Sequence, residues 1–248
     1  MTTPASRRLA LVGLGRMGRA VAELAPEHGW EVVARIGSRA NAGGQGAGIT
    51  RESLAGAAVA IEFTTPAAAP ANVRALVAAG CPVVSGTTGW YDALPEISAM
   101  VQRAGGALVA APNFSPGVAV FERVVVLAAQ LLAGIAGFDA HLVETHHAGK
   151  RDAPSGTARA LVTAASGWTG RDGHGIPITS IRTGSVPGTH EVIFDAPFES
   201  IRLAHVARDR RVFAAGALAA AAWLVAEPRR GVFGMRDVIG HPEMSRSS

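Results

Sequence analysis

The sequence predicts an α/β protein in which a parallel-sheet unit is followed by an α+β unit. In the first 115 residues, apolar runs of strand length alternate with helical stretches and short turns, which is typical of βαβ units. From about residue 116 this alternation stops, and strand-like runs then follow one another with only turns between them. With 248 residues, 48% of them hydrophobic, the chain is long and apolar enough to form a core in each unit.

Five apolar runs in the first unit are expected to form strands. They are residues 9–12, 31–39, 57–66, 82–89 and 107–115. Helices are expected at 17–24, 69–80 and 94–105, while the glycine-rich loop at 41–48 contributes little to a core. Because helices and short loops connect the strands, we expect a parallel sheet.

The second unit is expected to combine helices with a sheet. A long helix at 118–132 precedes a strand at 138–147, in which apolar and polar residues alternate, and a helix at 156–165. Further strands are expected at 178–184, 188–196 and 199–209. Antiparallel pairing is the simple solution for strands this close together, so the sheet should be mixed or antiparallel. The alanine-rich segment at 210–227 is apolar nearly all round, which predicts a buried helix.

Composition disfavours several classes of protein. A net charge of +4, with one tyrosine and eight phenylalanines, is poor support for nucleic-acid binding and fits a small anionic ligand better. The longest apolar runs, 124–138 and 212–226, are shorter than the ~20 residues of a membrane span, and the N-terminus predicts a strand, not a signal peptide. Cys81 is the only cysteine, so no intramolecular disulfide can form and a cytoplasmic protein is expected.

A glycine pattern typical of dinucleotide binding follows the first expected strand. It is a G-x-G-x-x-G sequence, formed by Gly13, Leu14, Gly15, Arg16, Met17 and Gly18. The first glycine permits a tight turn, the second lets backbone approach a pyrophosphate, and the third lets the helix pack close to the strand. The sequence therefore predicts a Rossmann-type unit that binds a nicotinamide dinucleotide, with an ordinary glycine-rich turn as the alternative.

The residues after the second expected strand bear on the choice of cofactor. A carboxylate that binds the adenosine ribose is expected about 20 residues after the glycine pattern. Gly37, Ser38 and Arg39 stand there instead. Ser38 and Arg39, with Arg35 nearby, are suited to a 2′-phosphate, which a carboxylate would repel. We therefore expect a preference for NADPH, with NADH possible.

Two further loops are expected to line the nicotinamide part of the site. One includes Gly86, Thr87 and Thr88, and the other includes Ala111, Pro112, Asn113 and Phe114. Each loop ends an expected parallel strand, and ligands of open α/β sheets bind beyond the carboxyl ends of the strands. Generic turn residues are the alternative interpretation.

The segment ETHHAGKRDAPSGTARAL, residues 144–161, contains the densest group of reactive side chains. A metal site is not expected there, because His146 and His147 are adjacent on a strand and point to opposite faces, and no second His/Cys pair has metal-site spacing. A hydrolase nucleophile is also disfavoured, because Ser155 lacks the G-x-S-x-G elbow. Anion binding is the interpretation that fits the segment best.

The start of a helix would hold the anion. Ser155, Gly156 and Thr157 open this helix, whose free N–H groups and positive dipole end favour a carboxylate. Lys150 and the two histidines lie just upstream and offer charge and exchangeable protons. A plain N-cap at Ser155 or Thr157 is the alternative.

This segment resembles the dihydrodipicolinate reductases, also called 4-hydroxy-tetrahydrodipicolinate reductases, a family of bacterial lysine biosynthesis. GRMGR, EFTTP, GTTG, APNFSPGV, HEVIF, FAAGALAAAAWL and GVFGMRDVIG also look like family segments, in the family order. The chain departs from the family by being shorter around the glycine turn and the loop after the second strand. The usual acidic cofactor residue is replaced by the Gly37-Ser38 region, while Arg182, His190 and Arg210 look retained.

The resemblance implies roles for individual residues. His146 would be the proton donor and Lys150 its catalytic partner, although the sequence does not decide which of the two delivers the proton. A dicarboxylate substrate would be bound by His147, Ser155, Gly156 and Thr157, and the glycine pattern and its two companion loops would bind the cofactor.

Domains and assembly are also implied. Residues 1–115 would form the dinucleotide-binding domain, 116–211 the substrate-binding and oligomerisation domain, and 212–248 would return to the first domain in a homotetramer. Two other functions stay open. One is another nicotinamide-dependent amino or keto acid oxidoreductase on the same scaffold, and the other is a non-catalytic NADP-binding sensor.

Overall fold

The computed structural model describes residues 7–41, 45–168 and 175–240, which form two compact units. Unit 1 contains the described residues up to Ser115 together with those from Arg211 onward, and unit 2 runs from Pro116 to Arg210. Two parts of the sequence interpretation lie outside the described residues. They are residues 42–44 of the glycine-rich loop and residues 1–6 of the N-terminus, for which a signal peptide was considered.

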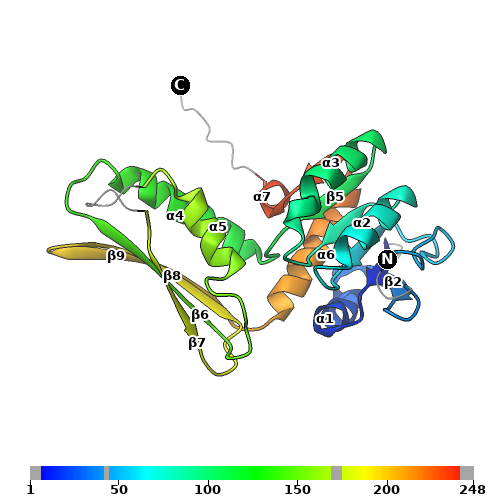
Figure 1. Ribbon diagram of the computed structural model, residues 1–248, viewed down its shortest axis with the longest axis horizontal. Coiled ribbons are helices and arrows are strands. Elements are labelled where there is room, and N and C mark those ends of the chain that lie inside the picture. The colour runs from blue at the N-terminus through cyan, green and yellow to red at the C-terminus, as the bar shows by residue number, and fades with distance from the viewer. Residues whose placement is uncertain (1–6, 42–44, 169–174, 241–248) are drawn as a thin grey trace, which may run out of the picture. The chain divides into compact units, whose positions relative to one another are not determined.

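Unit 1 is built on a parallel sheet of six strands, in the order β10-β5-β4-β3-β1-β2. The strands are β1 (Arg7–Val12), β2 (Trp30–Ile36), β3 (Val59–Glu62), β4 (Val83–Ser85), β5 (Ala107–Ala110) and β10 (Gly231–Phe233). The central strands are apolar on both faces because helices cover both sides, so the predicted α/β class is confirmed (Figure 1). The strand order reverses between β1 and β3, and such switch points are where open α/β sheets bind ligands.

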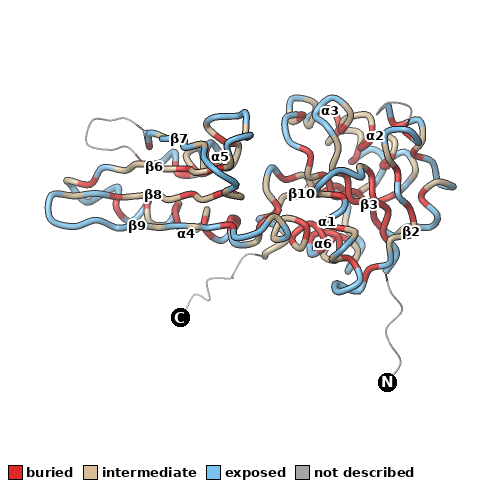
Figure 2. Tube along the Cα trace, turned by 90° about the horizontal axis from the view of Figure 1, so that it is seen from below, coloured by how far each residue is buried: buried red, intermediate tan, exposed pale blue. Residues whose placement is uncertain are grey.

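The helices of unit 1 are α1 (Arg16–Leu24), α2 (Ala69–Ala78), α3 (Leu94–Arg103), α6 (Arg211–Ala226) and α7 (Met235–Val238), with 3₁₀ turns at Pro26–His28 and Tyr91–Ala93. The alanine-rich α6 contacts α1 and the strands β3, β4 and β5, where its small side chains permit close packing. Figure 2 shows α6 as a largely buried helix. No helix in the described ranges is long and apolar enough to cross a membrane.

The strand β10 was not predicted from the sequence. Its three residues add a sixth strand beside β5, with Val232 paired to Leu108. A run of three residues is too short to show a strand period.

Unit 2 is a four-stranded sheet in the order β7-β6-β8-β9, with two helices packed on one face (Figure 1). The strands are β6 (Asp139–His146), β7 (Ile178–Arg182), β8 (Gly188–Ala196) and β9 (Glu199–Ala207), and the helices are α4 (Pro116–Leu132) and α5 (Gly156–Ala164). Alternate residues of β6 and β8, among them Leu142, Val192 and Phe194, are fully buried beneath the helices. The alternation predicted for the strand at 138–147 is therefore present, and β8 has the same period of two.

The expectation of antiparallel pairing was wrong for one strand. β8 pairs antiparallel with β6 and β9, but β7 pairs parallel with β6, which makes the sheet mixed. The chain passes through α5 between β6 and β7, so it crosses over the sheet before β7 begins. Such a crossover returns the chain in the parallel direction.

Candidate active site

Three buried polar side chains lie at one end of the core face of unit 2. Glu144 and His146 alternate with Leu142 on β6, and His190 occupies the matching position two residues before Val192 on β8. The face that is apolar under the helices thus becomes polar toward the carboxyl end of β6. Buried polar groups need partners, so this change in the pattern indicates a built site.

The carboxylate of Glu144 is the centre of this group. Its Oε1 accepts hydrogen bonds from the Ser155 N–H at 2.9 Å, the Ser180 hydroxyl at 2.7 Å and the Arg182 guanidinium at 2.8 Å. Burial raises the pKa of Glu144, but the hydrogen bonds from these three residues lower it more, to about 2. The buried carboxylate is therefore ionised, and its charge is matched by Arg182.

Two imidazoles face the other oxygen of Glu144. Oε2 lies 3.3 Å from His146 Nδ1 and 3.8 Å from His190 Nε2. Burial lowers the pKa of His146, against the opposing effect of Glu144, and burial lowers the pKa of His190 to about 4. Both rings are therefore mainly neutral near pH 7, and they pack edge to face with centroids 5.1 Å apart.

The start of α5 contacts carboxylates of the chain itself. Ser155 is the N-cap of α5, and its hydroxyl accepts the Ala158 N–H at 3.1 Å, so the N-cap alternative is present in the structure. Its own N–H is held by Glu144, while the backbone of Gly156 donates to Asp152. The helix N-terminus thus binds carboxylate groups, as its dipole and free N–H groups favour.

Lys150 and His147 lie beside this helix start. The ammonium of Lys150 contacts both oxygens of Asp152, at 2.7 and 3.0 Å, and Asp152 is half exposed. His147, Gly156 and Thr157 are partly exposed, whereas Ser155 is buried. The structure therefore brings His146, Lys150 and the residues at the start of α5 into one region of unit 2.

One group of residues in the described part of the chain has the spacing of a metal site. Glu144, His146 and His190 each offer a ligand atom, and these atoms lie within 4.8 Å of one another. From the sequence, Glu144, His146, His147 and Asp152 offered ligand atoms, and a metal was disfavoured because the two adjacent histidines diverge. The contribution of His190 from β8 was not predicted. Because Arg182 already neutralises the charge of Glu144, we interpret the three side chains as a carboxylate packed against two imidazoles and not as metal ligands.

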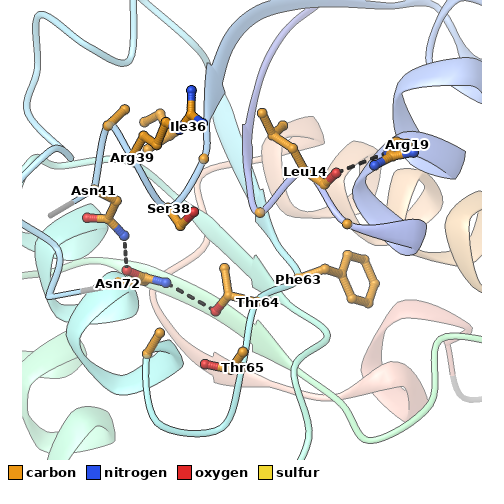
Figure 3. A pocket seen from close by; sticks show the side chains of 15 residues that line it. Leu14, Arg19, Ile36, Ser38, Arg39, Asn41, Phe63, Thr64, Thr65 and Asn72 are labelled. Carbon is orange, nitrogen blue, oxygen red and sulfur yellow. Dashed lines mark hydrogen bonds between the residues drawn. The ribbon is translucent and has the colours of Figure 1, made fainter. Parts of the chain in front are cut away.

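Unit 1 contains a pocket of about 980 Å³ at the carboxyl ends of β1, β2 and β3 (Figure 3). Its lining includes Gly13, Leu14 and Gly15 after β1, and Ser38 and Arg39 after β2. It thus lies at the switch point of the sheet, where α/β proteins bind nucleotides.

The glycines of the G-x-G-x-x-G pattern have the geometry that dinucleotide binding requires. Gly13 has φ +96°, and a Cβ there would meet the carbonyl oxygen of Phe63 at 2.0 Å. A Cβ on Gly18 would meet the carbonyl oxygen of Gly13 at 2.0 Å, whereas Gly15 faces open space. Gly15 is also the N-cap of α1 and has no side chain to cover the helix N-terminus, so an anion can approach it.

The remaining predicted cofactor residues do not line the described pocket. Arg16 and Met17 lie in the first turn of α1. The predicted loops follow β4 and β5, on the same edge of the sheet, and their residues Gly86, Thr87, Thr88, Ala111, Pro112, Asn113 and Phe114 are absent from the lining of this pocket. Among them, Phe114 is buried and packs edge to face against Phe63.

A buried carboxylate connects the ends of β3 and β4. Glu62, at the end of β3, accepts hydrogen bonds from the hydroxyls of Thr64, Ser85 and Thr87. Asn72 of α2 donates to Thr64 and accepts from Asn41, as the dashed lines in Figure 3 show. This network fixes the ends of β3 and β4 beside the pocket, although the sequence argument gave Glu62 no role.

Comparison with known proteins assigns the chain to a family. A model of the N-terminal part of dihydrodipicolinate reductase matches residues 7–114, and a model of the C-terminal part matches residues 117–239. The chain belongs to the dihydrodipicolinate reductase family. The resemblance noted in the sequence is thereby confirmed.

Individual relatives of the reductase agree with this assignment. The 4-hydroxy-tetrahydrodipicolinate reductase of Acidiphilium cryptum is 38% identical, over 95% of this chain and 98% of its own length. That of Christiangramia forsetii is 33% identical, over 93% and 97%. A dipicolinate-bound dihydrodipicolinate reductase from Paenisporosarcina sp. TG-14 shares the fold, with a TM-score of 0.72 at 20% identity over 94% of this chain and 99% of its own.

Several residues of the reductase site were given no role by the sequence. Arg182 and His190 looked retained, and Glu144 was considered only as a metal ligand. All three come from strands that meet only in the folded sheet. Glu144 stands at a position of β6 where the alternation predicts a buried apolar residue. A charged residue at such a position is the signal that could have identified it.

Treatment with a chelator should leave the reductase active. Because three hydrogen bonds to Oε1, one of them from Arg182, hold the Glu144 carboxylate without a cation, dialysis against EDTA should change neither the rate of cofactor oxidation nor the melting temperature. Assays before and after dialysis, followed by addition of Zn²⁺, provide the check. A rate that falls on dialysis and recovers with Zn²⁺ would show that Glu144, His146 and His190 hold a required metal.

Proposed function

We propose that the chain reduces 4-hydroxy-tetrahydrodipicolinate to tetrahydrodipicolinate with NADPH, a step of diaminopimelate and lysine biosynthesis. The observation that supports this most is the grouping of His146, Lys150 and the start of α5 around a buried, ionised Glu144. Cationic and helix-terminal donors suit a dicarboxylate, and an imidazole supplies an exchangeable proton. The pocket of unit 1 is suited to the dinucleotide.

Substrate carboxylates are proposed to bind at Lys150 and the N-terminus of α5, with His147 beside them. The Asp152 carboxylate contacts the Lys150 ammonium and accepts the Gly156 N–H. A substrate carboxylate therefore has to displace Asp152, which is half exposed and able to move aside, and not the fully buried Glu144. Ser155 acts mainly as the N-cap that holds α5 in place.

The chemistry needs one hydride and one proton for each substrate. Loss of water from the 4-hydroxy ring leaves a conjugated system, and a bound nicotinamide cofactor supplies the hydride that reduces it. Negative charge then develops on the ring, where the cation of Lys150 stabilises it. His146, with Lys150 beside it, delivers a proton to the atom that gains this charge. The ring thus gains one hydride and one proton, and the cofactor is left oxidised.

The bound cofactor is proposed to rest on the glycine turn, with its pyrophosphate at the N-terminus of α1. Ser38 and Arg39 lie exposed at the pocket lining, where a 2′-phosphate can reach them. These two residues support NADPH as the preferred cofactor, with NADH accepted less well.

Replacing Arg39 tests this preference. Arg39→Ala should raise KM for NADPH about tenfold or more and leave KM for NADH nearly unchanged, because only NADPH has the phosphate that an arginine pairs with. Steady-state rates with both cofactors measure this, and Arg103→Ala, an exposed site of unit 1, controls for net charge. A wild-type preference of tenfold for NADH would contradict the assignment.

The experiment that tests the proposed function is oxidation of NADPH in the presence of freshly generated product of dihydrodipicolinate synthase. A screen of amino and keto acids under the same conditions separates this function from that of another oxidoreductase on the scaffold. Faster turnover of any of those acids would overturn the proposed substrate. Binding of NADPH without any turnover would instead identify a sensor.

The chain is further proposed to be a cytoplasmic homotetramer. Val120, Val124, Leu127 and Leu131 form an exposed apolar stripe along α4 of unit 2, which is a surface suited to contact between subunits. Cys81, the single cysteine, is buried and unpaired, which is compatible with a reducing compartment.

A further inference from the structure

Glu144 uses its two carboxylate oxygens differently. Oε1 accepts three hydrogen bonds, from Ser155, Ser180 and Arg182, and these fix the carboxylate between β6, β7 and the start of α5. Oε2 is buried and has no hydrogen-bond partner. A buried, charged oxygen with unused acceptor capacity is costly unless a donor can reach it.

The nearest donor for Oε2 is the ring of His146. Nδ1 of His146 lies 3.3 Å away and is itself buried without a partner, while His190 Nε2, at 3.8 Å, is beyond hydrogen-bond range. The 3.3 Å contact is not aligned as a hydrogen bond. Such bonds are often long before substrate binds and tighten in the complex.

The other nitrogen of His146 faces β8. A Cβ on Gly188 would come within 3.1 Å of His146 Nε2, so the glycine keeps space open beside this nitrogen. The ring is also held from the side by the edge-to-face contact with His190. His146 is therefore held with Nδ1 toward Glu144 and Nε2 toward Gly188.

We propose that Glu144 is the positioning residue for His146: its Oε2 accepts the Nδ1 proton, fixes the ring tautomer, and balances the positive charge when Nε2 is protonated. Arg182, Ser180 and the Ser155 N–H hold the carboxylate in place for this role. The inference rests on the proposed function, in which His146 gives its proton to the substrate. Glu144 acts through His146 and touches no reacting atom.

Several charged or titratable groups surround His146. Burial has the largest effect on the pKa of His146 and lowers it. Glu144 and Asp152 raise this pKa, and the cations Lys150 and Arg182 lower it. His190 lies against the ring and is neutral near pH 7, with its own neighbour His205 on β9. Glu144 is the one anion among these groups that is fully buried, and it is fixed by three hydrogen bonds.

The tautomer of His146 tests the inference in the wild-type protein. We expect the ¹⁵N chemical shifts of its imidazole, assigned by comparison with His146→Gln, to show a neutral ring protonated at Nδ1 at pH 7–8 in the ligand-free chain. A ring protonated at Nε2 would overturn the proposal. This measurement needs no substrate, so its outcome is independent of whether the proposed reaction occurs.

A charge-removing variant tests the functional consequence. In Glu144→Gln, His146 loses the anion that raises its pKa. The fraction of molecules with a protonated His146 therefore falls at lower pH than in the wild type. We expect kcat to fall at least ~10-fold, the basic limb of the kcat profile to move to lower pH, and KM for substrate to change little. Glu144→Asp should restore part of the rate, because it keeps the charge.

The control variant is Glu191→Gln, which removes a partly exposed carboxylate from the neighbouring strand β8 and should leave the profile unchanged. A folded Glu144→Gln protein with a wild-type kcat profile would refute the positioning role. If that variant does not fold, the tautomer of the wild type and the pH profile of Glu144→Asp decide. Absence of reductase activity in the wild type would refute the proposed function instead.

Discussion

Replacing His146 by glutamine is expected to lower kcat by roughly 10²–10⁴-fold while the protein stays folded. The reason is local: the ring is the buried imidazole whose Nδ1 faces the ionised Glu144, and glutamine cannot deliver a proton. Lys150→Ala should lower kcat more than ~100-fold as well, because it removes the cation beside the same position. Rates at saturating substrate, with circular dichroism to verify folding, measure both effects.

Matched controls lie on the same elements. His141→Gln changes a histidine of β6 that contacts Thr179 and lies away from Glu144, and Arg151→Ala removes an exposed cation next to Lys150. Both controls should retain nearly the wild-type rate. Near-wild-type rates in His146→Gln and Lys150→Ala would contradict the assigned roles.

Two glycines of the dinucleotide turn are expected to respond in opposite ways to the same substitution. Gly18→Ala should destabilise the protein by about 1–3 kcal/mol, because its Cβ would lie 2.0 Å from the backbone oxygen of Gly13, which has little freedom to move. Gly15→Ala should leave stability almost unchanged, since a Cβ there meets nothing within 4 Å. That open space is where the pyrophosphate approaches, so Gly15→Ala should instead weaken cofactor binding at least ~10-fold.

Urea unfolding and titration with NADPH separate the two effects. The pair distinguishes a residue needed for packing from one needed for the ligand, since both substitutions add the same methyl group to one turn. Unchanged cofactor affinity in Gly15→Ala would show that the turn does not bind the pyrophosphate, and the nucleotide site of unit 1 would have to be sought elsewhere.

Much of the architecture could be predicted because it depends on local patterns. The alternation of strands and helices in unit 1 follows from the burial of both faces of the parallel sheet, and the period of two in β6 follows from the burial of one face. The parallel pairing of β7 could not be predicted in this way, because it depends on the path of the chain through α5 and not on the strand itself. The short β10 has no pattern of its own and depends on its neighbour β5.

In the candidate site, too, some residues could be predicted from a local sequence pattern and others depend on the fold. The segment around His146 and Lys150 is continuous in sequence, so its reactive residues could be identified together. His190 and Arg182 reach Glu144 only through the register of the sheet, in which His190 pairs with Glu144 and Arg182 pairs with His146. Strand register over such distances is set by tertiary packing, and a single sequence does not reveal it.

The central claim is that this chain transfers a hydride from a nicotinamide cofactor to the ring of 4-hydroxy-tetrahydrodipicolinate. The most direct measurement uses NADPH that carries deuterium at both C4 positions, with mass spectrometry of the product. The account predicts tetrahydrodipicolinate with one deuterium from the cofactor, formed by the wild-type protein and far more slowly by His146→Gln. Oxidation of the cofactor without deuterium in the product, or no oxidation at all, would contradict it.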